Sequence, residues 1–155
     1  MSTLLDGMTK EIRQLHHTLI DLVGMMNRPQ RDVALIREAG IKIDRALFPL
    51  LVGIERKGPI GIVELADLAG RNYTTVSRQV ATLERLGLVA RHTGKADKRV
   101  REAVITPKGR IMTDALDAAR ARVASRLLAK WSKRDLQMLA SLMRRFADDL
   151  LAWRG

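Results

Sequence analysis

Hydrophobic and polar positions alternate along the chain with a period that changes from one stretch to the next. In residues 4–27 apolar side chains recur mostly at steps of three and four, which predicts one long amphipathic helix. Its stripe contains Leu4, Leu5, Met8, Ile12, Leu15, Leu19, Leu22, Val23 and Met26. Arg28-Pro29 ends it, because the residue before a proline disfavours helical backbone. Residues 31–39 predict a short helix that ends at Gly40.

A strongly apolar segment follows in residues 43–56, and we expect another helix there. Pro49 lies inside this segment. An interior proline removes one hydrogen bond and clashes with the preceding turn, so a kink is expected between Arg45 and Pro49. Residues 57–61 contain two glycines and a proline and predict a turn that leads into a minimal extended segment.

Two helices are predicted near the C-terminus. Thr106 before Pro107 is a favourable helix start, and the helix should run to Lys130. Ser132, with Asp135 three residues later, predicts a capping box at the start of the last helix. Its apolar positions are Leu136, Leu139, Leu142, Met143, Phe146, Leu150 and Trp153.

The central part of the chain predicts a short helix, a tight turn and a longer helix. The first helix spans 62–69, and the second spans 73–86 and ends at Gly87. Asn72 should cap the second helix by accepting from the amide of Thr74 or Thr75. On a helical wheel the buried side of the second helix carries Val76, Val80 and Leu83, and the opposite side carries Thr74, Arg78, Thr82 and Arg85.

Two short strands follow at 88–93 and 100–106, on either side of a basic loop at 94–99. The register of the second strand stays open, because Val100, Glu102 and Val104 alternate with Arg101, Ala103 and Ile105. Two helices joined by a turn, followed by a hairpin, are typical of a winged helix-turn-helix, which places its second helix in the DNA major groove. The fold class we expect is therefore mainly α with a small β-hairpin wing.

The second helix and the wing carry the side chains expected to meet DNA. An arginine can form two hydrogen bonds with guanine, and a threonine can offer a methyl or hydroxyl to a base edge. The expected contacts of the recognition helix are Tyr73, Thr74, Thr75, Ser77, Arg78, Gln79 and Thr82, and those of the wing are Lys95, Asp97, Lys98, Arg99 and Arg101. Asp97 is expected to brace an arginine by a charged hydrogen bond.

Charge is concentrated in the same region. The 155 residues carry a formal net charge of +11. Residues 71–110 hold 10 basic and 3 acidic residues, a net +7, whereas residues 1–70 are balanced and residues 111–155 carry +4. A local excess of this kind favours a polyanion-binding face over an ordinary solvated one. The five aromatic residues are not interleaved with the basic ones, so duplex DNA fits better than a single strand.

Other classes of function have little support. The chain has no cysteine, which excludes disulfides, thiolate metal sites and thiol redox sensing. Histidines and carboxylates show no metal-ligand spacing, and no nucleophile elbow or phosphate-binding glycine loop is present, so we expect no metal, no cofactor and no enzymatic activity. With neither a signal peptide nor a membrane span expected, a soluble cytoplasmic protein follows, associated with the nucleoid when bound to DNA.

Several motifs, in the right order, resemble the MarR family of bacterial regulators. They are residues 75–80 (Thr-Val-Ser-Arg-Gln-Val), 83–91 (Leu-Glu-Arg-Leu-Gly-Leu-Val-Ala-Arg), 97–99 (Asp-Lys-Arg) and 105–109 (Ile-Thr-Pro-Lys-Gly). The resemblance covers the central half of the chain by motif and all of it by helix order.

That resemblance implies a homodimer bound to a pseudo-palindromic operator, usually as a repressor. One compact chain would then hold N-terminal dimerisation helices at 1–40, a winged helix-turn-helix at 41–110 and C-terminal dimerisation helices at 111–155. Many members release DNA when a small lipophilic or phenolic anion binds in a cleft between the two regions. By this analogy the pocket would include His16, His17 and Phe48, and Pro49 leaves its shape open.

Two alternatives to an effector-responsive regulator are kept. The first is an architectural DNA-binding protein of the same fold that responds to no effector and is indifferent to sequence. The second is a small-molecule-binding protein whose contact with DNA is incidental, which predicts no footprint on DNA.

Overall fold

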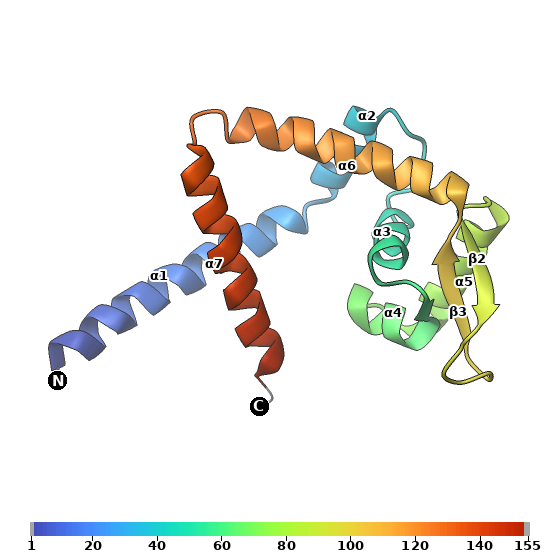
Figure 1. Cartoon of the computed structure of the whole chain (residues 1–155), viewed down its shortest axis with the longest axis horizontal. Coiled ribbons are helices and arrows are strands. Elements are labelled where there is room, and N and C mark those ends of the chain that lie inside the picture. The colour runs from blue at the N-terminus through green and yellow to red at the C-terminus, as the bar shows by residue number, and fades with distance from the viewer. Residues whose placement is uncertain (1, 154–155) are drawn as a thin grey trace. The chain divides into compact units, whose positions relative to one another are not determined.

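The computed structural model describes residues 2–153 and places seven helices and three strands in that range (Figure 1). In chain order they are α1 (Ser2–Met26), α2 (Pro29–Ala39), α3 (Phe48–Lys57), β1 (Ile60–Gly61), α4 (Ile62–Ala69), α5 (Tyr73–Arg85), β2 (Val89–Thr93), β3 (Arg101–Ile105), α6 (Pro107–Leu127) and α7 (Lys133–Ala152). The mainly helical fold with a small β wing is therefore confirmed. No helix in the described range is both long and apolar enough to span a bilayer.

The chain divides into two compact units, Met1–Ala119 and Arg120–Gly155, and α6 runs from the first into the second. The hydrophobic core of the first unit is built from α3, α4, α5 and the strands. Side chains of Leu50, Leu51, Ile54 and Leu65 are almost completely buried there. Removing a side chain of this size from water stabilises the fold by about 2 kcal/mol.

A tight turn joins α4 to α5 and forms the helix-turn-helix. Gly70 ends α4 in the left-handed conformation, with φ of 64°, which glycine adopts without steric cost. Asn72 then begins α5: its Oδ1 accepts a hydrogen bond from the backbone N–H of Thr75 at 2.8 Å. The predicted cap is confirmed, and so is the predicted buried side of α5, whose members are Val76, Val80 and Leu83.

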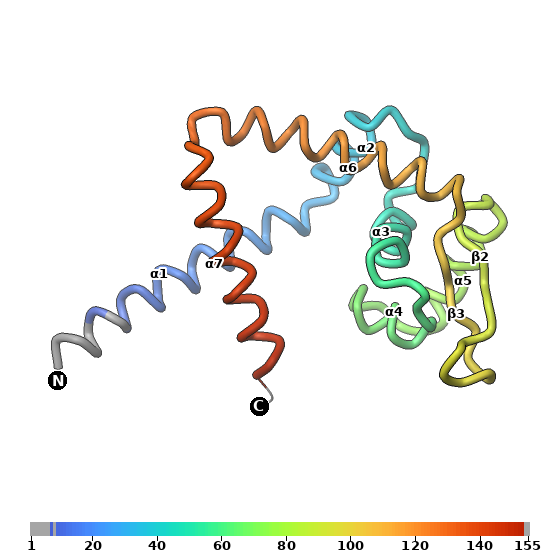
Figure 2. Tube along the Cα trace, in the orientation of Figure 1, coloured from blue at the N-terminus to red at the C-terminus, as the bar shows by residue number. Residues whose placement is uncertain are grey.

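The three strands form an antiparallel sheet in the order β1-β3-β2, with β3 in the centre. Ala103 pairs with Ile60 on one side and Arg91 on the other, and it is fully buried. Burial of Ala103 settles the register that the alternating pattern of the strand left open. The chain between β2 and β3 forms the wing loop, which Figure 2 follows as a continuous trace.

The expectation of a kinked helix over residues 43–56 was wrong. The helix α3 begins only at Phe48, so Pro49 stands in its first turn, where a missing N–H costs no helical hydrogen bond. Before it, Asp44 organises a turn: its Oδ1 accepts from the backbone N–H of Ala46 at 2.8 Å. Aspartate commonly forms such turns with the backbone two residues on, and here the turn replaces the expected first helical turns.

The end of α5 is tied to the start of α6. The hydroxyl of Thr106 donates to the carbonyl of Gly87 at 2.6 Å and accepts from the N–H of Gly109 at 3.0 Å. The Nζ of Lys108 donates to the carbonyl of Leu86 at 3.0 Å. These bonds fasten the first turn of α6 to the residues that follow α5, and the predicted helix start at Thr106-Pro107 is confirmed.

In the second unit, α7 begins with the predicted capping box. The N–H of Asp135 donates to Oγ of Ser132 at 3.0 Å, and the carboxylate of Asp135 accepts from the N–H of Ser132 at 3.4 Å. The apolar stripe of α7 is largely exposed within the single chain, with Leu136, Leu142, Met143 and Leu150 all accessible. A stripe of this length on a helix that buries no residue is typical of a surface covered by a partner.

Candidate nucleic-acid interface

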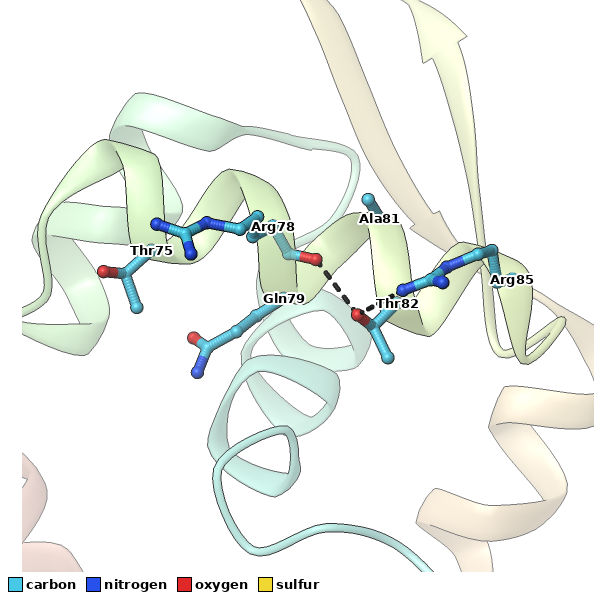
Figure 3. A pocket seen from close by; sticks show the side chains of 6 residues that line it. All are labelled: Thr75, Arg78, Gln79, Ala81, Thr82 and Arg85. Atoms are coloured by element: carbon cyan, nitrogen blue, oxygen red, sulfur yellow. Dashed lines mark hydrogen bonds between the residues drawn. The ribbon is translucent and has the colours of Figure 1, made fainter.

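The outer face of α5 carries two shallow hollows lined by the predicted contact residues. Thr75, Arg78, Gln79 and Thr82 line the first, together with Ala81 and Arg85 (Figure 3). Tyr73, Thr74, Ser77 and Arg78 line the second, together with Ala81 and Arg91. Thr74, Arg78 and Thr82 lie on the side of α5 opposite the three side chains that hold it to the core. Tyr73, Thr75, Ser77 and Gln79 flank that side, and the last three of them are half-buried.

Within the first hollow the hydroxyl of Thr82 is already engaged. It donates to the carbonyl of Arg78 at 3.1 Å and accepts from Nη2 of Arg85 at 3.0 Å (Figure 3). Its methyl group is therefore the part best suited to a base edge, where it can contact a thymine methyl. Arg85, which the sequence placed on the outer side of α5 without a specific role, is held along the helix by this bond.

The wing loop presents an exposed group of charged side chains. Lys95, Asp97, Lys98 and Arg99 lie in the loop and Arg101 opens β3, and all five are exposed. Asp97 closes the turn, because its Oδ1 accepts from the backbone N–H of Arg99 at 3.0 Å. The same oxygen lies 3.8 Å from Nε of Arg99, which is within ion-pair distance but too far for the expected charged hydrogen bond.

The side chain of Arg99 is 95% exposed despite this pairing, so its guanidinium is free to reach an anion. An exposed ion pair of this kind adds little to stability. The wing thus combines a turn fixed by Asp97 with cations that project from it.

Two arginines outside the predicted set stand next to this face. Arg71 donates from Nη1 to Oε1 of Gln79 at 2.9 Å. Arg91 is half-buried beside α5, donating from Nη2 to the carbonyl of Ser77 at 3.4 Å. Its Nε lies 3.7 Å from Oε2 of Glu84, too far for a hydrogen bond, and has no hydrogen-bond partner in the described part of the chain.

Sequence reasoning missed both arginines for physical reasons. Arg71 lies in the turn that the sequence predicts, and its partner Gln79 lies on the next helix. Arg91 stands on β2 and meets Ser77 only because the sheet packs beside α5. The sequence offered one indication of the role of Arg91: it lies in a predicted strand, and that strand has to pack against α5.

The residues expected at an effector pocket do not line either hollow on α5. Phe48 is buried at the start of α3, whereas His16 and His17 are exposed on α1, with ring centroids 6.4 Å apart. Their role stays a prediction from the family resemblance. Among the described residues there is no group of three or more histidines, aspartates or glutamates that could hold a metal ion.

Solved structures share this architecture. A MarR family protein from Bacillus stearothermophilus superposes with a TM-score of 0.73 and 19% identity, over 92% of this chain and 97% of that one. MarR itself gives a TM-score of 0.67 and 21% identity, over 87% and 98% of the two chains. A probable transcriptional regulator from Pseudomonas aeruginosa is 26% identical, with a TM-score of 0.55 over 83% and 98%.

Sequence similarity to a curated protein decides the family. The uncharacterized HTH-type transcriptional regulator YxaD of Bacillus subtilis (strain 168) is 30% identical over 103 residues, which are 66% of this chain and 72% of that protein. The chain belongs to the MarR family. A family model described as HVO_A0114 matches residues 47–106 of this MarR-family protein, the stretch that contains the core, the turn, α5 and the wing.

The family resemblance expected from the motifs is therefore confirmed. This MarR-family protein is a DNA-binding transcriptional regulator with a winged helix-turn-helix, and the family is not one of enzymes. The charge distribution agrees with this assignment, because residues 71–110, which include α5 and the wing, carry a net +7.

Proposed function

We propose that this MarR-family regulator binds a pseudo-palindromic operator as a homodimer, with α5 of each subunit in a major groove and each wing at the adjacent minor groove. The observation that carries the proposal is the two-sided character of α5. Val76, Val80 and Leu83 anchor it to the core, whereas Arg78 and its neighbours face outward. A helix held rigidly by its inner side can place its outer side chains against base edges.

The exposed apolar stripe of α7 supports the dimer. A helix with Leu136, Leu142 and Leu150 open to water needs a partner surface to bury them, and a second copy of the chain supplies an identical stripe. Two-fold symmetry in the protein then matches two-fold symmetry in the operator.

Repression and release by an effector are the finer parts of the proposal. A dimer seated on an operator beside a promoter blocks transcription by occupying the DNA, and the family resemblance implies release by a small lipophilic or phenolic anion. A regulator of this kind works where the chromosome is, in the cytoplasm. A panel of hydroxybenzoates added to the protein–operator complex tests release, and an operator affinity unchanged by any of them argues for an effector-independent protein.

Replacing Arg78 with alanine should weaken binding to the operator by about 1–3 kcal/mol, roughly 5- to 150-fold, and relax specificity at one base pair. The reason is that Arg78 is exposed on the outer face and carries the guanidinium best suited to guanine. Titrations of operator and random duplex at fixed salt measure both effects. Arg56→Ala, which removes the same charge from the exposed end of α3, is the matched control; equal losses on the two duplexes would remove Arg78 from base reading.

Lys98→Ala should act differently, because an exposed lysine on the wing is suited to a phosphate rather than a base. Binding to all sequences should weaken together, and the slope of log K against log salt should become shallower by about 1. Titrations at several salt concentrations measure the slope. A slope that stays at the wild-type value would mean that Lys98 touches no phosphate.

The proposal as a whole is tested by binding to the DNA upstream of the protein's own coding sequence. A preference of about 10³ or more over random duplex at physiological salt is expected for a specific regulator. Equally tight binding to the upstream DNA and to random duplex, with a steep salt dependence, would favour the architectural alternative. That conclusion requires that DNA fragments from elsewhere in the genome also bind no tighter than random duplex.

A further inference from the structure

Arg71 is held in place by both helices of the helix-turn-helix. Its backbone N–H donates to the carbonyl of Ala66 in α4 at 3.0 Å, directly after the left-handed Gly70. The next residue, Asn72, caps α5. Because α4 ends just before Arg71 and α5 begins just after it, the backbone of Arg71 is fixed and its Cα–Cβ bond points in a defined direction.

The guanidinium of Arg71 joins two segments that are distant in sequence. Nη1 donates to Oε1 of Gln79 at 2.9 Å and to the carbonyl of Ala46 at 2.7 Å, in the turn before α3. Both bonds are partly buried. The two protons of Nη1 are thereby used, and the carbonyl of Ala46 holds the group against rotation away from Gln79.

This contact also fixes which way round the amide of Gln79 lies. Arginine has donors and no acceptor, so the atom of Gln79 that faces it must be Oε1 and not Nε2. Gln79 lines the first hollow on the outer face of α5, beside Thr75 and Arg78 (Figure 3). The amide therefore has its oxygen engaged within the protein and its two N–H donors left for a ligand in the hollow.

We propose that Arg71 is a positioning residue for sequence recognition, which holds the carbonyl of Gln79 and so makes Gln79 a donor toward DNA. The proposal rests on the function proposed above. A glutamine with a free amide prefers adenine, because it accepts from N6 and donates to N7 at the same time. Oε1 keeps a second lone pair, but its bond to Arg71 turns it toward the protein and leaves the Nε2 donors for the hollow. Gln79 therefore suits a base that presents only acceptors at that edge, and guanine, with O6 and N7, is the best match.

The test is selection from a pool of randomised duplexes by the full-length wild-type protein and by five variants. Gln79→Ala identifies the base pair beneath Gln79 as the one whose preference falls, by roughly 5- to 150-fold for the loss of a good contact. Wild type should select guanine there. Arg71→Ala should shift the preference at the same base pair toward adenine, because the released amide can rotate.

Gln79→Glu is the sharper variant, since it keeps an oxygen for Arg71 and replaces the donors with an acceptor. At the same base pair it should select cytosine, whose N4 donates in the major groove. Arg71→Lys keeps a cationic donor and should restore part of the preference for guanine. The double variant with alanine at both positions should match Gln79→Ala, because Arg71 acts through Gln79.

Each other outcome overturns the proposal. If Arg71→Ala folds and weakens binding to every sequence equally, Arg71 is a phosphate contact or a structural residue. If wild type selects adenine beneath Gln79, the amide is not held as described. If wild type enriches no sequence at all, the proposed regulatory function fails and this inference fails with it. That outcome is distinguishable from the others, because it is seen with the wild-type protein alone.

Discussion

Replacing Leu139 with glutamate should break the proposed homodimer into monomers and lower the affinity for a full operator roughly 100-fold or more. Leu139 lies near the middle of the apolar stripe of α7 and is 38% exposed in the single chain. Buried between two subunits, a carboxylate without a partner loses its hydration, and the symmetric interface places two of them there. Each monomer then binds one half-site and loses the gain from binding two at once.

Ser141→Glu is the matched control, because it adds the same charge to an exposed position about 200° around the same helix. Light scattering after size exclusion gives the mass of each variant, and titration of full and half operators gives the affinities. The control should remain dimeric and bind both DNAs as wild type does. A dimeric Leu139→Glu variant with unchanged affinity would show that α7 is not the essential dimer surface.

Gly109→Ala should destabilise the first unit by about 3 kcal/mol or more, at the upper end of what overpacking costs. Gly109 is buried in the first turn of α6, against the start of β2. A Cβ there would lie 2.7 Å from Cδ1 of Ile105 and would collide with the carbonyl oxygen of Leu88. The carbonyl is part of the backbone and cannot rotate aside as a side chain would.

Thermal unfolding measures this effect, with a fall in Tm of roughly 6–12 °C for a loss of about 3 kcal/mol in a chain of this size. Gly53→Ala is the control: it makes the same change inside α3, where a Cβ would meet only Cδ1 of Leu65 at 3.2 Å and Cδ2 of Leu68 at 3.6 Å. Those methyl groups can shift by a few tenths of an ångström, so its stability should stay within about 1 kcal/mol of wild type. Equal Tm values for the two variants would mean that α6 moves away from β2 at little cost.

Local interactions explain why much of the fold was predictable from the sequence. Asn72 and Ser132 each bond to an amide three residues away, and helical periodicity alone separates Val76 from Arg78. The error at Pro49 was also local in origin, because the turn made by Asp44 competes with the helix that the apolar pattern suggested. The apolar pattern alone does not show which of the two is more stable.

The parts that could not be predicted depend on contacts between distant segments. The register of β3 follows from its pairing with β1 and the burial of Ala103, neither of which the alternation of β3 reveals. The bond between Arg71 and Ala46 spans 25 positions, so no spacing rule points to it. The outer face of α5 was predictable because it is one side of one helix, whereas the orientation of Gln79 on that face depends on another element.

The bonds between Thr106 and Gly87, and between Lys108 and Leu86, have a consequence for insertions and deletions. Because they fasten the start of α6 to the residues after α5, one residue inserted just after Lys108 would turn the buried side of α6, which carries Thr113, Leu116 and Ala119, by about 100°. Insertions in this part of α6 should therefore come as whole pairs of turns, about seven residues at a time. The wing loop has no such constraint, so its length should vary by single residues.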